Sequence, residues 1–391
     1  KDFDEGEASN ALISSLGEVR PGLATARIDL ATEAVWTAVA APDGTVYAGT
    51  VGDGAILAVS GGKKRVLTTL GADSPWIGAL ALAEGGTLYA GTIGTATIHA
   101  IDTRTGKATK LLTLDGPEHI WSLAFDSTQK RLFAGTGPNG QLFEIDLAKK
   151  TAREIWASEE THLLAVTRAT DGALWLGTSD EAILYRYDPA TAQARAIADF
   201  AGSEVKAVVE VDGAFVGAVN EFEAKPTPPP SSPSTKGPKG TAAKPPEAGA
   251  VPGAEKPKHD GGLPARPGER KGKGALFRVD TTGRVEQLHA LAEGYFQSLA
   301  VAKDGSVYAA AAAQGRVYQL RPDRTVLTAV DVPERQVNVV MTLPTGLVFA
   351  TGDGGAVYVG SGPAKEAHYT SKVFDAQFPA RWGNLRWRGD P

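Results

Sequence analysis

A five-residue pattern recurs along the chain at nearly even spacing. It reads VYAGT at 46–50, LYAGT at 88–92, LFAGT at 132–136 and LWLGT at 174–178. Its glycines, Gly49, Gly91, Gly135 and Gly177, are separated by 42, 44 and 42 residues. AFVGA follows 40 residues on, and two weaker copies read VYAAA at 307–311 and VFATG at 348–352. A repeat of this length indicates an array of one supersecondary unit, here present seven times.

Each copy belongs to a unit of four short runs in which apolar and polar residues alternate. In residues 121–156 the runs are WSLAFDSTQK, RLFAGTGPNG, QLFEIDLAKK and TAREIW. Such runs, separated by Gly, Asp, Asn and Lys turns, are typical of antiparallel strands. Asp-Gly pairs in APDGTVY, ATDGALW and AKDGSVY predict tight type I′ hairpins between the first two strands. The recurrent glycine is expected on the second strand, where adjacent sheets approach closely.

The outermost runs number one fewer than the units. Six of them follow third strands, from RVLTTLG at 65–71 to TVLTAVDV at 325–332, but none follows GAVYVGSG at 355–362. The N-terminal run ARIDLATEAVW, residues 26–36, is predicted to complete the last unit. This closes a ring and removes exposed strand edges. We therefore predict an all-β fold, a seven-bladed β-propeller over 25–363 with its N-terminal strand closing the last blade, preceded by an N-terminal extension over 1–24.

The units resemble those of WD40-like propellers and, more closely, those of two-component-regulator propellers of the secreted bacterial kind. DGALWLGTSDEAILYRYDP at 171–189 carries this likeness, although the Gly-His and Trp-Asp pairs of true WD40 repeats are missing. The resemblance covers most of the chain and implies the fold. Propellers of this kind serve as binding platforms, sensor ectodomains and sometimes enzymes, so the resemblance implies no single function.

Residues 225–274 interrupt the fifth unit between its second and third strands. They contain 12 of the 24 prolines and ten Lys or Arg against four Asp or Glu. The segment has no aromatic residue and little to bury, which predicts a disordered insertion. Two readings stay open: a solvated insertion without a binding role, and a basic tether that contacts a polyanion or an acidic partner.

Residues 364–391 leave the repeat pattern and are rich in aromatic residues, among them Phe374, Phe378, Trp382 and Trp387. That is a large apolar surface for a solvated tail. The segment is expected to begin a further β domain; the alternative is a strap packed on the side of the propeller.

Composition excludes several classes of function. The net charge of −5 does not fit a dedicated nucleic-acid binder, and no apolar run is long enough for a membrane-spanning helix. The chain has no cysteine, which excludes disulfides, thiol catalysis and thiolate metal sites. The absence of cysteine and a first residue other than Met lead us to expect an exported protein, periplasmic or extracellular.

Candidate contact residues lie where the innermost strands begin, around the mouth of the central channel. Aligning the units by their first hairpins places Trp36, Gly78, Trp121, Leu164, Val205, Gln297 and Asn338 at one equivalent position. Residues two positions apart on a strand point the same way, so the residues two places earlier belong to the same rim. The predicted ligand-binding rim is Trp36, Trp76, His119, Trp121, His162, Tyr295, Gln297, Gln336 and Asn338. Aromatic rings and amides in a concave site suit a sugar or a peptide; the alternative is that the tryptophans wedge between blades.

His119 and His162 would lie in neighbouring blades, and some propeller lyases use channel histidines with a divalent cation. The pattern supplies no third histidine, and no P-loop, G-x-S-x-G elbow or H-E-x-x-H motif occurs. No metal or cofactor is therefore expected. The sequence favours a non-enzymatic propeller that binds a protein, peptide or glycan partner through its loop face. The alternative is a lyase or lactonase that uses His119 or His162 as its base, and a third possibility is a module that only spaces domains.

Overall fold

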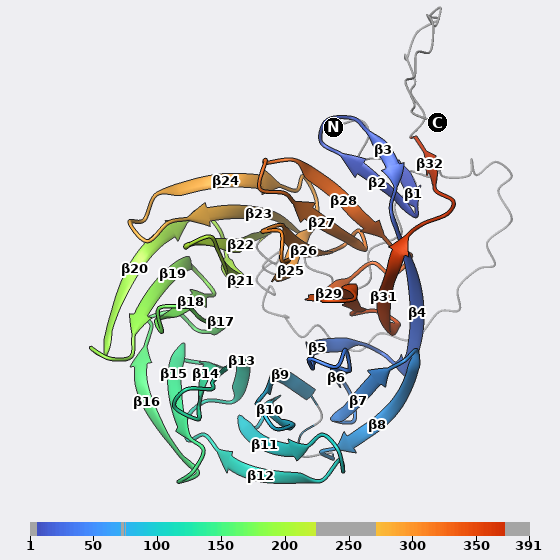
Figure 1. Ribbon diagram of the computed structural model, residues 1–391. Coiled ribbons are helices and arrows are strands. Elements are labelled where there is room, and N and C mark those ends of the chain that lie inside the picture. Colours follow the sequence, from blue (N-terminus) through green and yellow to red (C-terminus); the bar gives the residue numbers. More distant parts are fainter. Residues whose placement is uncertain (1–5, 72–73, 75, 224–270, 372–391) are drawn as a thin grey trace, which may run out of the picture.

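The computed structural model describes residues 6–71, 74, 76–223 and 271–371. These residues form strands and turns, and none of them lies in a helix that could cross a membrane. Seven four-stranded antiparallel units surround a common centre, which confirms the predicted seven-bladed propeller (Figure 1). A single residue pair, Ile93–His119, also joins the second unit to the third.

In blades one to six the strands run in chain order from the centre outwards, and so do the first three strands of blade seven. The innermost strands are β5 (Val35–Ala40), β9 (Trp76–Leu82), β13 (His119–Asp126), β17 (Leu163–Arg168), β21 (Glu204–Val211), β25 (Tyr295–Val301) and β29 (Val337–Leu343). The second strands are β6 (Val46–Thr50), β10 (Thr87–Ile93), β14 (Arg131–Gly137), β18 (Leu174–Thr178), β22 (Ala214–Phe222), β26 (Val307–Ala312) and β30 (Gly346–Thr351). The third strands are β7 (Ala55–Ser60), β11 (Thr97–Asp102), β15 (Gln141–Asp146), β19 (Ala182–Asp188), β23 (Gly272–Val279), β27 (Arg316–Leu320) and β31 (Gly355–Pro363). The outermost strands of blades one to six are β8 (Lys63–Thr69), β12 (Ala108–Thr113), β16 (Thr151–Ala157), β20 (Gln193–Phe200), β24 (Val285–Ala290) and β28 (Val326–Asp331).

The ring is closed by β4 (Leu23–Thr32), the outermost strand of blade seven. It pairs antiparallel with β31, with Ile28 opposite Val357. Glu334 fixes the closure: its carboxylate accepts hydrogen bonds from Arg27 Nε at 2.8 Å and from the Tyr358 hydroxyl at 2.7 Å. Burial and this hydrogen bond raise the pKa of Tyr358. The predicted closing strand is confirmed, although it begins a few residues earlier than the sequence indicated.

The segment before β4 packs on blade six. β2 (Ala11–Ser14) pairs with β28 on the outer edge of that blade, and β3 (Val19–Pro21) pairs with β2. β1 (Glu7–Ser9) pairs with β32 (His368–Thr370), so the first and last strands lie side by side next to the ring (Figure 1). The aromatic residues of the C-terminal segment, Phe374 onwards, lie outside the described residues.

The insertion in blade five is narrower than predicted. β22 and β23 pair as far as Phe222 opposite Gly272, and Glu223 N donates to Lys271 O at 3.0 Å. Lys273 and Gly274, which the sequence assigned to the insertion, belong to β23. Residues 225–270 of the predicted insertion lie outside the described residues. The last described residues on either side of them, Glu223 and Lys271, are on the face where second and third strands are joined.

The three Asp-Gly hairpins on which the prediction was based are not type I′ turns. Gly44, Gly172 and Gly305 have φ of 86°, 89° and 80°, but the aspartates before them do not have positive φ. In the first hairpin, Gly44 N donates to Ala41 O at 2.9 Å, and the Asp43 carboxylate accepts from Thr45 N at 2.9 Å. These are longer loops that end in a left-handed glycine. The aspartate caps the loop instead of adopting positive φ.

The recurrent Gly-Thr pair has two structural roles. A Cβ on Gly49 would lie 2.7 Å from a methyl group of Ile77, and one on Gly177 would lie 2.9 Å from a methyl group of Val205, each on the innermost strand of the next blade. The glycine therefore lets adjacent sheets approach closely, as predicted. The threonine hydroxyl donates to the carbonyl five residues on, for example from Thr50 to Ala55 at 2.9 Å. It thereby bridges the loop between second and third strands.

A buried carboxylate joins blades three and four on the opposite side of the ring from these loops. Asp126 lies 3.2 Å from Arg131 Nε and 3.5 Å from Arg168, and its side chain is 1% exposed. Burial raises the pKa of Asp126, but the hydrogen bonds from Arg131 and the Gln129 backbone and the charge of Arg168 outweigh burial and lower it. The ionised carboxylate therefore stabilises the contact between the two blades.

We expect Asp126→Asn to lower the free energy of unfolding at neutral pH by about 2 kcal/mol, because two charged partners lose their counter-ion. The contribution of Asp126 is fully present above the unfolded-state pKa of about 3.9 and is lost as pH falls through the lower folded-state pKa. Urea denaturation at neutral and acidic pH measures this, and the variant should lose less stability on acidification. The control is Glu84→Gln, whose exposed pair with Lys130 should contribute less than about 1 kcal/mol. Equal effects of both substitutions would contradict this account.

Candidate functional site

Every innermost strand carries a β-bulge near its first residues. The register shifts between Val35 and Thr37, between Ile120 and Ser122, and at the equivalent place in the other five blades. A bulge leaves one residue unpaired and redirects its side chain. The unpaired residues are Trp36, Gly78, Trp121, Leu164, Lys206, Gln297 and Asn338.

The bulge separates two kinds of residue. The residue before it is apolar and fully buried in every blade, with 0% exposure for Val35, Ile77, Ile120, Leu163, Val205, Phe296 and Val337. The unpaired residue is at least partly exposed in every blade except at Gly78. The buried residue fixes the strand in the core, and the next residue faces solvent around the centre of the ring. The bulge thus turns one residue of each blade out of the sheet pairing.

The sequence alignment was wrong by one residue in blade five. It placed Val205 at the rim, but Val205 is buried and Lys206 is the unpaired residue. The sequence does contain a signal for the correct register. In the other blades that have a side chain at the rim, an apolar residue comes directly before the rim residue, and in blade five Val205 stands in the same way before Lys206. Lys206 therefore adds a cation to a rim that sequence reasoning had described as aromatic and amide.

Trp36 and Trp76 are the exposed tryptophans of the described residues. Trp36 is 40% exposed at the bulge of β5, and Trp76 is 48% exposed as the first residue of β9. The two strands are innermost in neighbouring blades and contact each other. A large aromatic side chain is usually buried, so two that face solvent on adjacent strands are an unusual feature of this surface.

His119, Trp121 and His162 form one cluster between blades three and four. The Trp121 ring centroid lies 5.2 Å from that of His119 and 5.3 Å from that of His162. Trp121 Nε1 donates to His162 Nδ1 at 3.2 Å, and Gly94 N donates to His119 Nδ1 at 3.2 Å. A Cβ on Gly137 would collide with His162, so a glycine is required beside the cluster. The predicted proximity of the two histidines is present, with Trp121 between them in contact with both.

These hydrogen bonds determine the tautomer of both imidazoles. A nitrogen that accepts from an N–H carries a lone pair, so in each neutral ring the proton is on Nε2. A general base or a metal ligand needs a free lone pair. At His119 and His162 that lone pair is already bonded to a backbone or an indole N–H. Among the described residues, moreover, no three His, Asp or Glu side chains are grouped to hold a metal ion.

The other rim residues differ in their exposure. Asn338 Nδ2 donates to Val35 O at 2.9 Å and links blade seven to blade one. Tyr295 is 8% exposed and its ring packs 5.1 Å from Phe222, so it belongs to the core. Gln297 and Gln336 are half-buried, and Gln336 N donates to Asp353 at 2.9 Å. The rim thus has an aromatic part on blades one to three and an amide part on blades six and seven.

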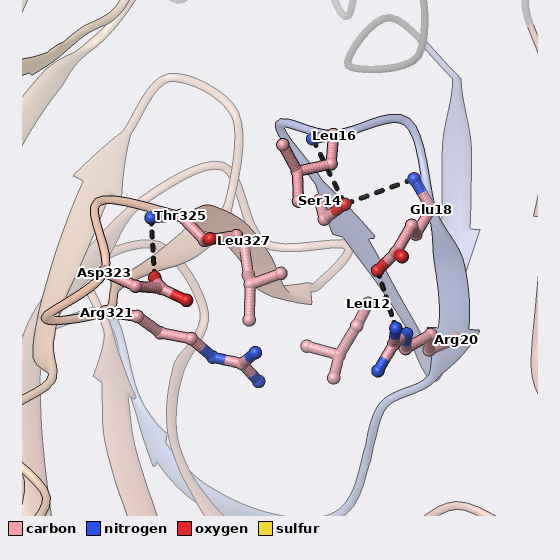
Figure 2. Close-up of a pocket in the computed structure, with 9 residues that line it drawn as sticks. All are labelled: Leu12, Ser14, Leu16, Glu18, Arg20, Arg321, Asp323, Thr325 and Leu327. Atoms are coloured by element: carbon pink, nitrogen blue, oxygen red, sulfur yellow. Dashed lines mark hydrogen bonds and ion pairs between the residues drawn. The ribbon is translucent and has the colours of Figure 1, made fainter.

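A separate pocket of about 220 Å³ lies on the outer side of blade six, between the β2–β3 hairpin and the turn before β28 (Figure 2). The guanidinium groups of Arg20 and Arg321 extend into it from opposite walls, with Leu12 between them (Figure 2). Arg20 pairs with Glu18 at 2.9 Å, and Asp323 lies beside Arg321. The two cations are balanced by two carboxylates, so the lining of the pocket carries no net charge.

No family model and no curated protein matches the chain. Solved structures do. The extracellular domain of a putative one-component system from B. thetaiotaomicron superposes with a TM-score of 0.60 at 14% identity, over 86% of this chain and 39% of that one. A streptogramin B lyase gives 0.62 at 12% identity, over 89% and 98% of the two chains. Virginiamycin B lyase from Staphylococcus aureus gives 0.63 at 10% identity, over 86% and 98%. The chain spans about two fifths of the sensor ectodomain that it matches. At these identities the likeness is one of fold alone, and the chain is a β-propeller.

Proposed function

We propose that this propeller is a non-enzymatic binding protein that recognises a protein, peptide or glycan partner through its loop face. By loop face we mean the loops that lead into the innermost strands together with those that join second and third strands. The observation that carries the proposal is the exposure of Trp36 and Trp76, 40% and 48%, on adjacent innermost strands. Tryptophans that a partner covers contribute heavily to binding, because each buries a large apolar area with few rotatable bonds.

The rigid support of these side chains favours recognition. Val35, directly before Trp36, and Ile77, directly after Trp76, are fully buried. The backbone that carries each indole is thereby held in a packed sheet. Little conformational entropy is then lost when a partner binds, which favours affinity.

The alternative is an enzyme, since lyases are among the proteins with this fold. It would use His119 or His162 as a base. The geometry favours the binding function, because the Nδ1 atoms of both histidines accept hydrogen bonds at 3.2 Å and their remaining nitrogens carry the protons.

We further propose that the protein is exported, in keeping with its lack of cysteine and with its likeness to an extracellular sensor domain. A second contact is proposed for the basic residues of 225–274, which would bind a polyanion. Binding through that segment should weaken steeply with salt, whereas contact through the tryptophans should not.

The test is capture of a partner from extract of the source organism by wild-type protein and by a Trp36→Ala/Trp76→Ala variant. We expect the variant to bind the captured partner at least about 30-fold more weakly, as for two central aromatic contacts. The control is Val66→Ala/Val285→Ala, which removes exposed apolar side chains from β8 and β24 on the outer rim. Equal loss in both variants, or none in either, would contradict the proposed function.

A further inference from the structure

The lysines and arginines of the loop face are confined to one of its two halves. On blades one to four the loops are 33–36, 51–54, 71–76, 94–96, 114–121, 138–140, 158–162 and 179–181, and they contain no lysine or arginine. They do contain exposed carboxylates at Glu33, Asp53 and Glu118. On blades five to seven the described part of this face carries Lys206, Lys271, Lys273 and Arg335 together with carboxylates such as Glu223, Glu293 and Asp353. We call the half formed by blades one to four, where no cation offsets the carboxylates, the acidic half.

The tryptophans lie in the acidic half. Glu33 is three residues before Trp36, and Glu118 is three residues before Trp121. Each loop therefore brings a carboxylate and an indole to the start of the same innermost strand. The face of an indole attracts a cation, most strongly a guanidinium, and a nearby carboxylate adds to that attraction.

Glu160 gives an independent indication that this half takes a cation. It lies in the loop between β16 and β17 and is 9% exposed. Its Oε2 atom is buried and has no hydrogen-bond partner among the residues that the structure describes. A buried carboxylate oxygen without a partner is costly, and a cationic group is the partner that offsets this cost most effectively. The pKa of nearby Tyr185 is raised first by burial and then by four carboxylates, those of Glu160, Glu159, Asp199 and Glu181. The negative field therefore extends across the boundary between blades three and four.

We propose that the half of the loop face formed by blades one to four binds a polypeptide segment rich in arginine or lysine. Its cationic side chains lie over Trp36 and Trp76 and beside Glu33 and Glu118. The lysines and arginine of blades five to seven offset the carboxylates there, so such a segment binds the acidic half more tightly. This inference rests on the proposed function and assigns the chemistry of its partner.

The test is the binding of a fluorescently labelled nona-arginine peptide to the full chain, followed by anisotropy. Glu33→Gln/Glu118→Gln should weaken binding about fivefold, because both carboxylates are exposed and have no ion-pair partner among the described residues. Trp36→Ala/Trp76→Ala should weaken it about tenfold or more. The matched control is Glu84→Gln/Glu286→Gln, which removes the same charge from exposed sites that pair with Lys130 and Arg324. It should leave the affinity within about twofold.

Three results would overturn the inference: no binding of the peptide, equal weakening in both charge variants, or binding of a neutral cellohexaose in place of the peptide. Each of these results can be distinguished from failure of the proposed function. If the captured partner still depends on Trp36 and Trp76 while nona-arginine does not bind, the binding face is retained and only its assignment to a cationic polypeptide fails. If neither depends on the tryptophans, both proposals fail.

Discussion

Deletion of residues 1–32 should abolish the folded monomer. This deletion removes β4, which fills the outermost position of blade seven, and leaves β31 with an open edge. Leu30, 3% exposed, would be lost from the core where blade seven meets blade one, together with the contact between Arg27 and Glu334. The loss is comparable with the whole stability of a domain, about 5–15 kcal/mol. Size-exclusion chromatography and thermal unfolding measure it, and a synthetic peptide of residues 23–34 should partly restore a monomer.

The control for this experiment is deletion of residues 1–21 only. That chain keeps β4 but loses β1 to β3, which pack outside blade six. The lost burial of Ile13, 2% exposed, should cost about 2–3 kcal/mol and leave a closed ring. If deletion through residue 32 gave a monomer with the same melting temperature as the shorter deletion, closure of the ring by β4 would be wrong.

Gly177→Ala should destabilise the propeller by about 1–3 kcal/mol, the range for overpacking a dense core. The added Cβ would lie 2.5 Å from Val205 O and 2.9 Å from a Val205 methyl group in the next blade. Val205 is itself fully buried, so its backbone carbonyl cannot move aside without shifting the blade. Urea denaturation followed by circular dichroism measures the change.

Gly217 provides a control at the equivalent position of the next repeat. A Cβ there would meet only one atom within 4 Å, a methyl group of Val205 at 3.9 Å. Gly217→Ala should therefore be neutral or stabilising by up to about 1 kcal/mol, because it restricts the unfolded chain. Two glycines of one motif should respond in opposite directions. Equal destabilisation at both positions would show that close approach between blades is not the reason for the glycine.

The fold was predictable because its determinants are local and repeated. The four-run unit, the close-packing glycine and the missing outermost strand each follow from the sequence, and together they require a closed ring. The hairpin type was not predictable from Asp-Gly alone, because the aspartate can either adopt positive φ or cap a longer loop; Asp43 does the second. β1 to β3 were missed because they belong to no repeat.

The site was predictable in position but only partly in detail. Sequence spacing placed Trp36, Trp76, His119, Trp121 and His162 on one rim, because an equivalent position in each repeat becomes an equivalent place on the ring. It did not distinguish exposed Trp76 from buried Tyr295, since exposure depends on neighbouring loops. It also placed Val205 at the rim in place of Lys206, because the alignment was made on the first hairpins and β21 reaches its Asp-Gly turn one residue sooner than the other innermost strands do. The hydrogen bonds that occupy both histidines join residues far apart in the chain.

The most direct test of a binding face without histidine chemistry is calorimetric titration of the captured partner into two variants. In His119→Asn/His162→Asn the amide oxygens can replace the Nδ1 acceptors that hold Gly94 and Trp121, while the imidazoles are removed. We predict that this variant binds with the wild-type affinity and enthalpy and that Trp36→Ala/Trp76→Ala does not bind measurably. If the histidine variant instead abolished turnover of a captured molecule while the tryptophan variant bound normally, the propeller would be an enzyme and its exposed tryptophans would not be the recognition surface.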